Sequence, residues 1–308
     1  MTLPQLTVLH TVVLGLAVLG GLLGALGVFA VARQQSLQGD AISHAAFPGV
    51  ALAIAFGGLN GEWLLAGGCF AGWLAMLISG LLLRRTKLPF DTVLAGLLAV
   101  SFGLGLAVMT YLQKLASRTP ANPFEMWVKP HATASLQLGL DRYLFGQAAF
   151  LTPDELQLIA AVGTAVVVVL LLAWKEFKLL SFDPEFAESL GWPRRLLDTA
   201  LTTLLVISVV LALKSVGVVL ASALLVAPAV AARYWAHRLS HMTMISALFG
   251  VGIGITGVLV SHSLSAFGNV PTGPVCVLTA MVVVLLSVLF GGYGVVVQYR
   301  HSRPKLSP

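Results

Sequence analysis

Nine apolar stretches run along the chain, and each has about the 20 residues that a helix needs to cross a lipid bilayer. Hydrophobic residues make up 58% of the sequence and charged residues only 10%, well below the roughly 25% charged residues of a soluble domain. The sequence therefore predicts an all-α polytopic membrane protein with about nine transmembrane helices, with eight or ten also compatible. The predicted spans are Leu6–Ala32, Ser36–Gly57, Trp63–Leu83, Asp91–Leu112, Pro153–Trp174, Leu196–Leu213, Val216–Ala236, Met242–His262 and Pro271–Val297.

The distribution of basic residues predicts the orientation of these spans. The charges lie in short clusters between the apolar stretches, so the net charge of +6 does not indicate a nucleic-acid partner. With nine spans, 13 of the 18 Lys and Arg residues fall on one side of the membrane and five on the other. Because basic residues are enriched in cytoplasmic loops, we expect the N-terminus outside and the C-terminus in the cytoplasm. Residues 1–300 are predicted to form a single transmembrane domain in the cell (inner) membrane, followed by a short cytoplasmic tail at 301–308.

Asp40 and His44 form the most specific candidate site. They lie four residues apart at the start of an apolar stretch, so a helix places both side chains on one face. Ionisable residues in a membrane segment are costly and often functional, and a carboxylate with an imidazole suits first-row divalent metals. The pair is therefore a candidate metal site in a translocation pathway. The alternative is a polar pair that only fixes helix packing.

Two prolines and three further histidines extend this hypothesis. Pro48 and Pro228 lie inside predicted spans, where a proline frees a backbone carbonyl that is tolerated if it is buried or lines a cavity. They predict kinks beside a central pathway, with purely structural kinks as the alternative. His262 ends a predicted span and is either a further metal ligand or a solvated residue at a helix end. His237 and His241 lie among arginines and predict an interfacial basic patch.

A short helix is predicted in the cytoplasmic loop between the fifth and sixth spans. Asp183 is a suitable N-cap, Pro184 suits the first helical position, and Glu185 favours the positive helix end. Gly191 is expected to end the helix, and Phe186 and Leu190 share one face. A simple connection does not need such a helix, so we expect it to dock on a partner. The long outer loop, Gln113–Thr152, is predicted to hold an extracellular helix or re-entrant piece at 139–147.

The sequence lacks three common catalytic motifs. No lysine follows a glycine, which excludes a Walker A phosphate loop, and no histidine is followed by glutamate, which excludes a His-Glu-x-x-His metalloprotease site. No serine has a glycine two residues before and two after it, so there is no nucleophile elbow. We therefore expect a protein that is not an enzyme and has no bound cofactor.

In series, these segments resemble the integral membrane permeases of ATP-binding-cassette importers for manganese, zinc and chelated iron. The resemblance covers nearly the whole chain in order. It rests on Gly39–His44 with Pro48-Gly49, on Tyr143–Ala149, on Lys175–Gly191 with Ser181–Ala187, on Leu224–Ala232 with Pro228, and on Pro271–Pro274. Leu88–Asp91 departs from the acidic pair that is common in the family, which weakens any role for Asp91.

The resemblance implies a set of partners and a role for each motif. The chain would pair with itself or with a second permease subunit, with two cytoplasmic ATPases, and with an extracellular or periplasmic metal-binding protein. Asp40 and His44 would contact the transported ion, which is substrate and not cofactor. Asp183, Glu185, Phe186, Ala187, Leu190 and Gly191 would form the segment that couples to the ATPase. A passive channel, an ion-coupled carrier or a siderophore-type permease remain alternatives, and the sequence does not choose among the three metals.

Overall fold

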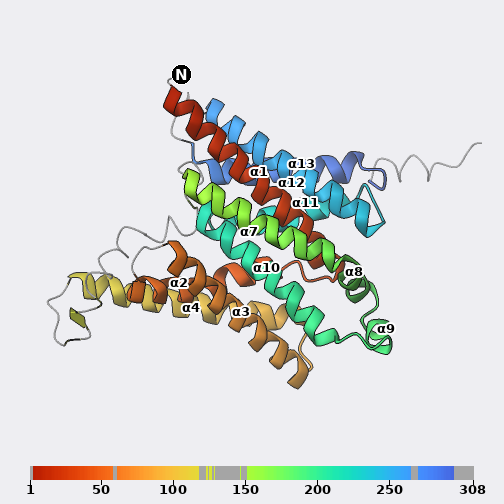
Figure 1. Ribbon diagram of the computed structural model, residues 1–308, viewed down its shortest axis with the longest axis horizontal. Coiled ribbons are helices and arrows are strands. Elements are labelled where there is room, and N and C mark those ends of the chain that lie inside the picture. Colours follow the sequence, from red (N-terminus) through yellow and green to blue (C-terminus); the bar gives the residue numbers. More distant parts are fainter. Residues whose placement is uncertain are drawn as a thin grey trace, which may run out of the picture. The chain divides into compact units, whose positions relative to one another are not determined.

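The computed structural model describes residues 3–57, 61–117, 123, 125–126, 128, 146, 151–264 and 270–294. Within these residues, all the regular secondary structure is helical (Figure 1). Eight of these helices are long and apolar enough to cross a membrane, which confirms the predicted all-α polytopic class. The elements are α1 (Leu3–Ala32), α2 (Gln38–Gly57), α3 (Gly61–Arg85), α4 (Phe90–Ser117), α7 (Pro153–Leu172), α8 (Trp174–Phe182), α9 (Pro184–Ser189), α10 (Arg194–Val216), α11 (Val218–Arg233), α12 (Leu239–Leu264) and α13 (Thr272–Phe290).

The largest differences between the predicted spans and the structure lie at α11 and at the C-terminal end of the chain. The expected seventh span, Val216–Ala236, is α11, which has only 16 residues and is shorter than the other apolar helices. The break before α11 falls at Gly217 and not near Lys214, because Gly217 has a φ of +84°, a conformation that glycine adopts at little cost. The predicted last span and the tail at 301–308 extend beyond residue 294 and so lie partly or wholly outside the described residues.

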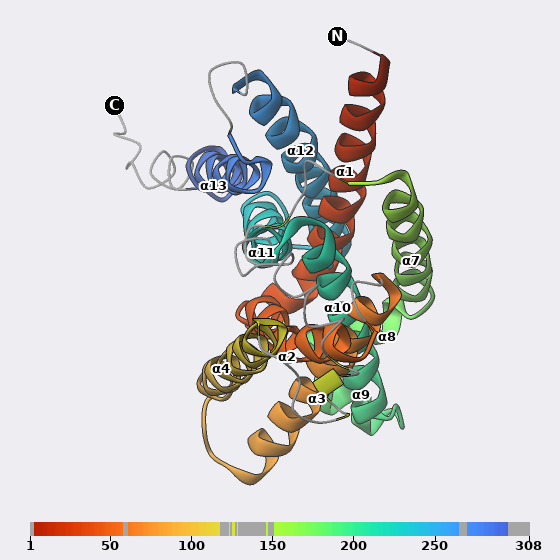
Figure 2. The same cartoon turned by 90° about the vertical axis from the view of Figure 1, so that its left-hand side faces the viewer.

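The chain divides into two compact units, and the first contains 1–36, 148–194 and 223–308. Its central feature is the antiparallel pair α1 and α12, which lie side by side (Figure 2). Gly20 faces the backbone of Gly250 so closely that neither position has room for a Cβ atom. One turn along, the Ser246 hydroxyl donates a hydrogen bond of 2.6 Å to the Gly24 carbonyl. Small residues of this kind let membrane helices approach closely.

The second unit contains 37–147 and 195–222, and α2 packs against both α3 and α4 within it. Gly49 of α2 and Gly67 of α3 face one another, again without space for a side chain. On the other side of α2, the Phe47 ring occupies the space that a Cβ atom at Gly105 of α4 would need. These contacts hold the middle of α2, just after the candidate metal pair, between two neighbouring helices.

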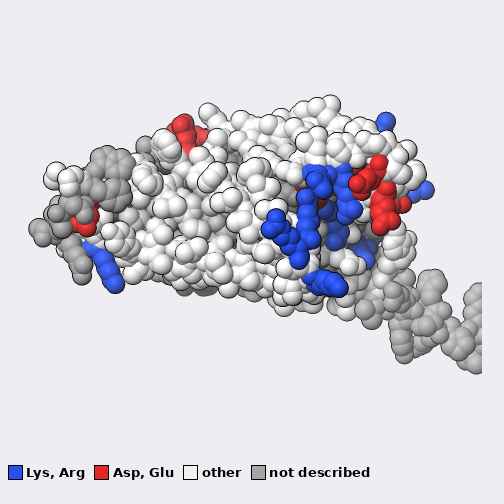
Figure 3. Space-filling view, turned by 90° about the horizontal axis from the view of Figure 1, so that it is seen from below, with Lys and Arg blue, Asp and Glu red and all other residues white. Residues whose placement is uncertain are grey.

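Large apolar side chains cover the outward sides of several long helices. Leu172 is 79% exposed, and Leu104, Leu171 and Leu278 are each more than half exposed. Most of the surface in Figure 3 is correspondingly uncharged, with the visible Lys and Arg side chains gathered in patches. A surface of this kind suits lipid contact, with charges kept to the helix ends.

The glycine contact between α1 and α12 can be tested by comparing substitutions at two glycines of α12, one in the contact and one outside it. Gly250→Ala should lower the midpoint of thermal unfolding in detergent by several degrees, because the new Cβ atom meets the Gly20 carbonyl. Gly252→Ala is the control, since nothing lies within 4 Å of the position that its Cβ atom would take, and removing a helical glycine is expected to be neutral or mildly stabilising. Equal midpoints for the two variants would contradict a close α1–α12 contact.

Candidate functional site

Asp40 and His44 lie on one face of α2, as the sequence predicts. Asp40 is in the first turn, where the positive end of the helix dipole favours a carboxylate. The His44 Nε2 atom is 3.6 Å from the Asp40 Oδ1 atom, and the side chains are 18% and 38% exposed, respectively. This separation is too long for a hydrogen bond, so the two groups are neighbours that remain able to accept other partners.

The surroundings of His44 leave one ring nitrogen without a protein partner. Its imidazole meets the Phe102 ring of α4 edge to face, with the ring centroids 5.0 Å apart. The Nδ1 atom is buried and makes no hydrogen bond. An unsatisfied buried polar atom costs about 1–3 kcal/mol, and such an atom needs a functional or structural explanation. The Nε2 atom, in contrast, faces Asp40 and is the ring nitrogen that a metal ion shared with this carboxylate would contact.

Gln38, six residues before His44, has a similarly unsatisfied amide, and no sequence motif points to it. Its side chain is 3% exposed, its Nε2 atom lies 4.0 Å from the Met76 sulfur of α3, and its Oε1 atom is buried without a partner. Ser43, in contrast, donates a hydrogen bond of 3.0 Å to the Gly39 carbonyl within the helix. The start of α2 therefore has two buried, unpaired polar atoms, and only their burial in the structure reveals them.

This arrangement offers an ion two ligands and not a closed cage. Among the residues that the structure describes, no group of three or more His, Cys, Asp and Glu side chains could hold a metal ion. Structural zinc sites, for comparison, usually have four protein ligands. A carboxylate and an imidazole alone can replace only part of an ion's hydration shell. Such a site is suited to brief contact with a passing ion.

Both prolines lie within helices that continue past them, and the kinks expected there stay a prediction. α2 continues through Pro48, and α11 continues through Pro228. Pro228 lies in the first unit, 3.4 Å from the position that a Cβ atom on Gly24 would take. This contact with α1 gives Pro228 a packing role, and a pathway role for either proline stays a prediction.

His262, His237 and His241 lie at or beside the ends of α12. His262 is exposed in the last turn of α12 in the first unit, and its role as a metal ligand stays a prediction. His237 and His241 are exposed near the start of α12, close in sequence to the exposed Arg233 and Arg238. The predicted outer segment at 139–147 falls almost entirely outside the described residues.

The predicted docking helix is present as α9, with the predicted cap. The Asp183 Oδ1 atom accepts a hydrogen bond of 2.9 Å from the Phe186 amide, and Pro184 takes the first helical position. Gly191 follows with a φ of +82°, which is the left-handed conformation that favours glycine after a helix. Ala187 is fully buried, whereas Phe186 and Leu190 are 52% and 56% exposed. Two large apolar side chains thus remain uncovered at a helix of six residues.

A second short helix, α8, precedes α9 and was not predicted. The predicted fifth span runs to Trp174, but α7 ends at Leu172 and α8 begins after Ala173. Trp174 and Phe177 both pack edge to face on Phe29 of α1, with centroids 5.6 and 6.4 Å away. The spacing of the buried Phe177 and Leu180, with lysines between the apolar positions, is the signal that could have revealed it. α8 thus attaches α9 to α1.

Known proteins are similar to this chain over nearly its whole length. The family model described as "ABC 3 transport family" matches residues 5–291. The manganese transport system membrane protein MntC of Bacillus subtilis is 37% identical over 279 residues, which are 90% of this chain but only 60% of MntC. The zinc transport system membrane protein TroC of Treponema pallidum is 37% identical over 92% of this chain and 89% of TroC.

A solved structure agrees with the fold. PsaBC from Streptococcus pneumoniae, determined in complex with a Fab, superposes with a TM-score of 0.76 at 27% identity, covering 94% of both chains. The likeness therefore extends over the whole helical arrangement and not over a single motif.

Proposed function

We propose that this chain, which belongs to the ABC 3 transport family, is the membrane-spanning permease subunit of an ATP-driven importer of divalent transition metal ions. The family match over 5–291 carries the proposal. Relatives that are 37% identical and named for manganese and zinc transport support the choice of substrate class. A passive channel or an ion-coupled carrier has no need of a capped helix with an uncovered apolar face such as α9.

The chemistry of α2 supports a divalent metal as cargo. A carboxylate and an imidazole suit manganese, zinc and iron alike. Asp40 supplies charge to an approaching cation, and His44 supplies a nitrogen lone pair from a ring that Phe102 contacts. Because the two ligands replace only part of the hydration shell, the ion can leave again, as transport requires. Binding by a full set of ligands would slow its release.

The proposed partners are inferred from the missing phosphate loop and from the exposed apolar face of α9. ATP hydrolysis is assigned to a separate ATPase, since the sequence has no phosphate loop. The exposed Phe186 and Leu190 side chains are the proposed contact for that ATPase. Movement of α9 would reach α1 through α8 and the Phe29 cluster. A second permease subunit and an extracellular metal-binding protein complete the proposed importer.

Removing either metal ligand should abolish uptake without affecting membrane insertion. In cells that depend on this importer, Asp40→Asn removes the negative charge and His44→Ala removes the imidazole, and accumulation of radioactive manganese or zinc should fall at least tenfold. Asp91→Asn is the matched control, because Asp91 is also an acid in the first turn of a spanning helix and is exposed. Normal uptake by both α2 variants, at normal protein level, would remove the pair from the pathway.

A charge on the uncovered face of α9 should release the ATPase. Phe186→Glu would place an unpaired charge in the proposed interface, at a cost of several kcal/mol, so the ATPase should be lost when the complex is purified through the permease. Leu88→Glu is the control, since Leu88 is an exposed apolar residue in another predicted cytoplasmic loop. An ATPase that stays bound to the Phe186→Glu permease would show that α9 is not the docking element.

The predicted orientation can be tested by labelling single cysteines in a variant without Cys69 and Cys276. Ser117→Cys, at the exposed end of α4, should react with a membrane-impermeant thiol reagent added to intact cells. Ser189→Cys, at the exposed end of α9, should react only after the cells are opened. The reverse pattern would invert the topology and place α9 away from any cytoplasmic ATPase.

A further inference from the structure

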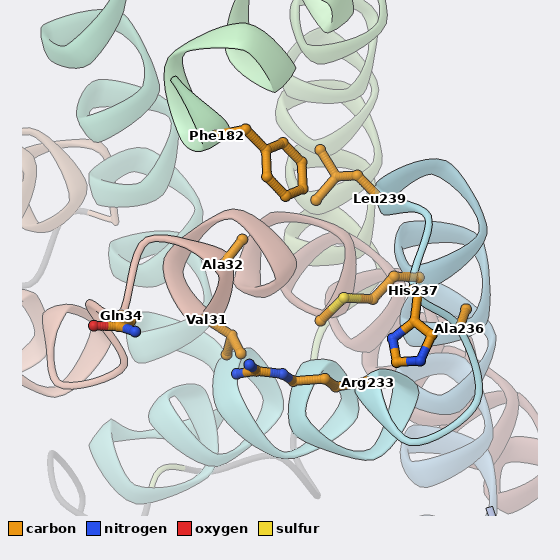
Figure 4. A pocket seen from close by; sticks show the side chains of 9 residues that line it. Val31, Ala32, Gln34, Phe182, Arg233, Ala236, His237 and Leu239 are labelled. Carbon is orange, nitrogen blue, oxygen red and sulfur yellow. The ribbon is translucent and has the colours of Figure 1, made fainter. Parts of the chain in front are cut away.

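The basic patch near the start of α12 contains a pocket that the proposed transport cycle does not use. The pocket has a volume of about 200 Å³ and lies within the first unit. Its walls come from the end of α1, the end of α8, the end of α11 and the beginning of α12 (Figure 4). Arg233 and His237 are its basic residues, and no Asp or Glu lies among the described residues that line it.

The pocket has a cationic side and an apolar side. In Figure 4 the Arg233 side chain extends toward Val31, and the His237 ring lies beyond the other end of that side chain, while the Phe182 ring and the Leu239 side chain lie together on the opposite wall. The His237 ring is also in contact with the Tyr293 ring, with centroids 3.7 Å apart, which limits the orientations of the imidazole. The position of the His237 ring is therefore defined by its neighbour.

The beginning of α12 adds to the positive potential of the pocket. α12 starts at Leu239, which lines the pocket, so the positive end of its helix dipole lies there. Arg233 is in the last turn of α11, and a basic residue at that position is commonly explained by the negative end of a helix dipole. That explanation accounts for Arg233 alone. It does not account for His237, for the start of α12, or for an apolar wall beside them.

We propose that this pocket binds the phosphodiester headgroup of an acidic phospholipid. The cationic side matches a phosphate, and the apolar side formed by Phe182 and Leu239 matches the adjoining glycerol and acyl chain. Trp235, between the two basic residues in sequence, is 46% exposed, as expected of an aromatic residue at a membrane interface. In the predicted topology the pocket lies on the cytoplasmic side, where basic pockets between membrane helices are suited to acidic lipid headgroups. Inorganic phosphate would match only the cationic side.

Native mass spectrometry of the purified full-length chain, titrated with phosphatidylglycerol, tests the proposal. One phosphatidylglycerol molecule should bind more tightly than any further copies. Arg233→Gln should weaken the binding of this molecule about fivefold, which is the effect of one Lys or Arg near a membrane surface. His237→Ala, as a separate single variant, should also weaken the binding of phosphatidylglycerol. Gel filtration checks that each variant remains folded. If one variant does not fold, the other still tests the proposal.

The control substitution separates a built site from general surface charge. Arg238→Gln removes the same charge from an exposed residue that does not line the pocket, so phosphatidylglycerol binding should stay within about twofold of the original. Equal weakening by Arg238→Gln and Arg233→Gln would mean diffuse attraction and would overturn the proposal. Equal binding of phosphatidylcholine would also overturn it, as would displacement of the lipid by an equimolar amount of inorganic phosphate.

Discussion

The close contact between the backbones of α1 and α12 is the interaction on which the first unit depends. Helices in a bilayer gain little from hydrophobic association, because lipid chains are as apolar as their side chains, so they associate through tight packing and hydrogen bonds. Gly20 and Gly250 provide the packing, and Ser246 provides a hydrogen bond to the Gly24 carbonyl. α11 joins the same cluster where Leu225 approaches Gly27. These contacts bury α1 almost completely from Leu22 to Val31.

The buried end of α1 then positions the elements that face the cytoplasm in the proposed topology. Phe29 is fully buried and receives Trp174 and Phe177 of α8. α8 leads directly into α9, whose Asp183 cap and Gly191 stop give a short helix with defined ends. The uncovered Phe186 and Leu190 side chains are thus held at a helix that is fixed to the transmembrane core. A partner that moves α9 would act on α1 and not on a loose loop.

The candidate metal pair relies on a comparable arrangement in the second unit. Gly49 allows α2 to approach α3 closely, and Phe102 of α4 lies against the His44 ring. The result is an imidazole with a buried, unpaired Nδ1 atom beside a carboxylate that is 38% exposed. Such an arrangement costs folding free energy, because the unpaired nitrogen has lost its hydration. The proposed contact with the transported ion would involve the Nε2 atom, which faces Asp40.

Features of the sequence that act locally could be predicted, and those that depend on tertiary packing could not. The apolar stretches, the four-residue spacing of Asp40 and His44, and the capped helix after Asp183 follow from length, helical periodicity and capping chemistry. The helix α8 was not predicted because its burial depends on Phe29, far away in the sequence. The end of α10 was predicted too early, near Lys214, whereas the backbone turns at Gly217. The unpaired Gln38 and His44 atoms depend on helices α3 and α4, which no local pattern specifies.

The central claim is that the transported ion contacts Asp40 and His44. Anomalous diffraction at the zinc edge, from crystals of the permease bound to its ATPase and soaked with zinc, tests this claim most directly. The account predicts a peak about 2 Å from both an Asp40 carboxylate oxygen and a His44 ring nitrogen, the usual distances for these ligands. A peak elsewhere along the membrane-spanning helices, with none at this pair, would contradict it.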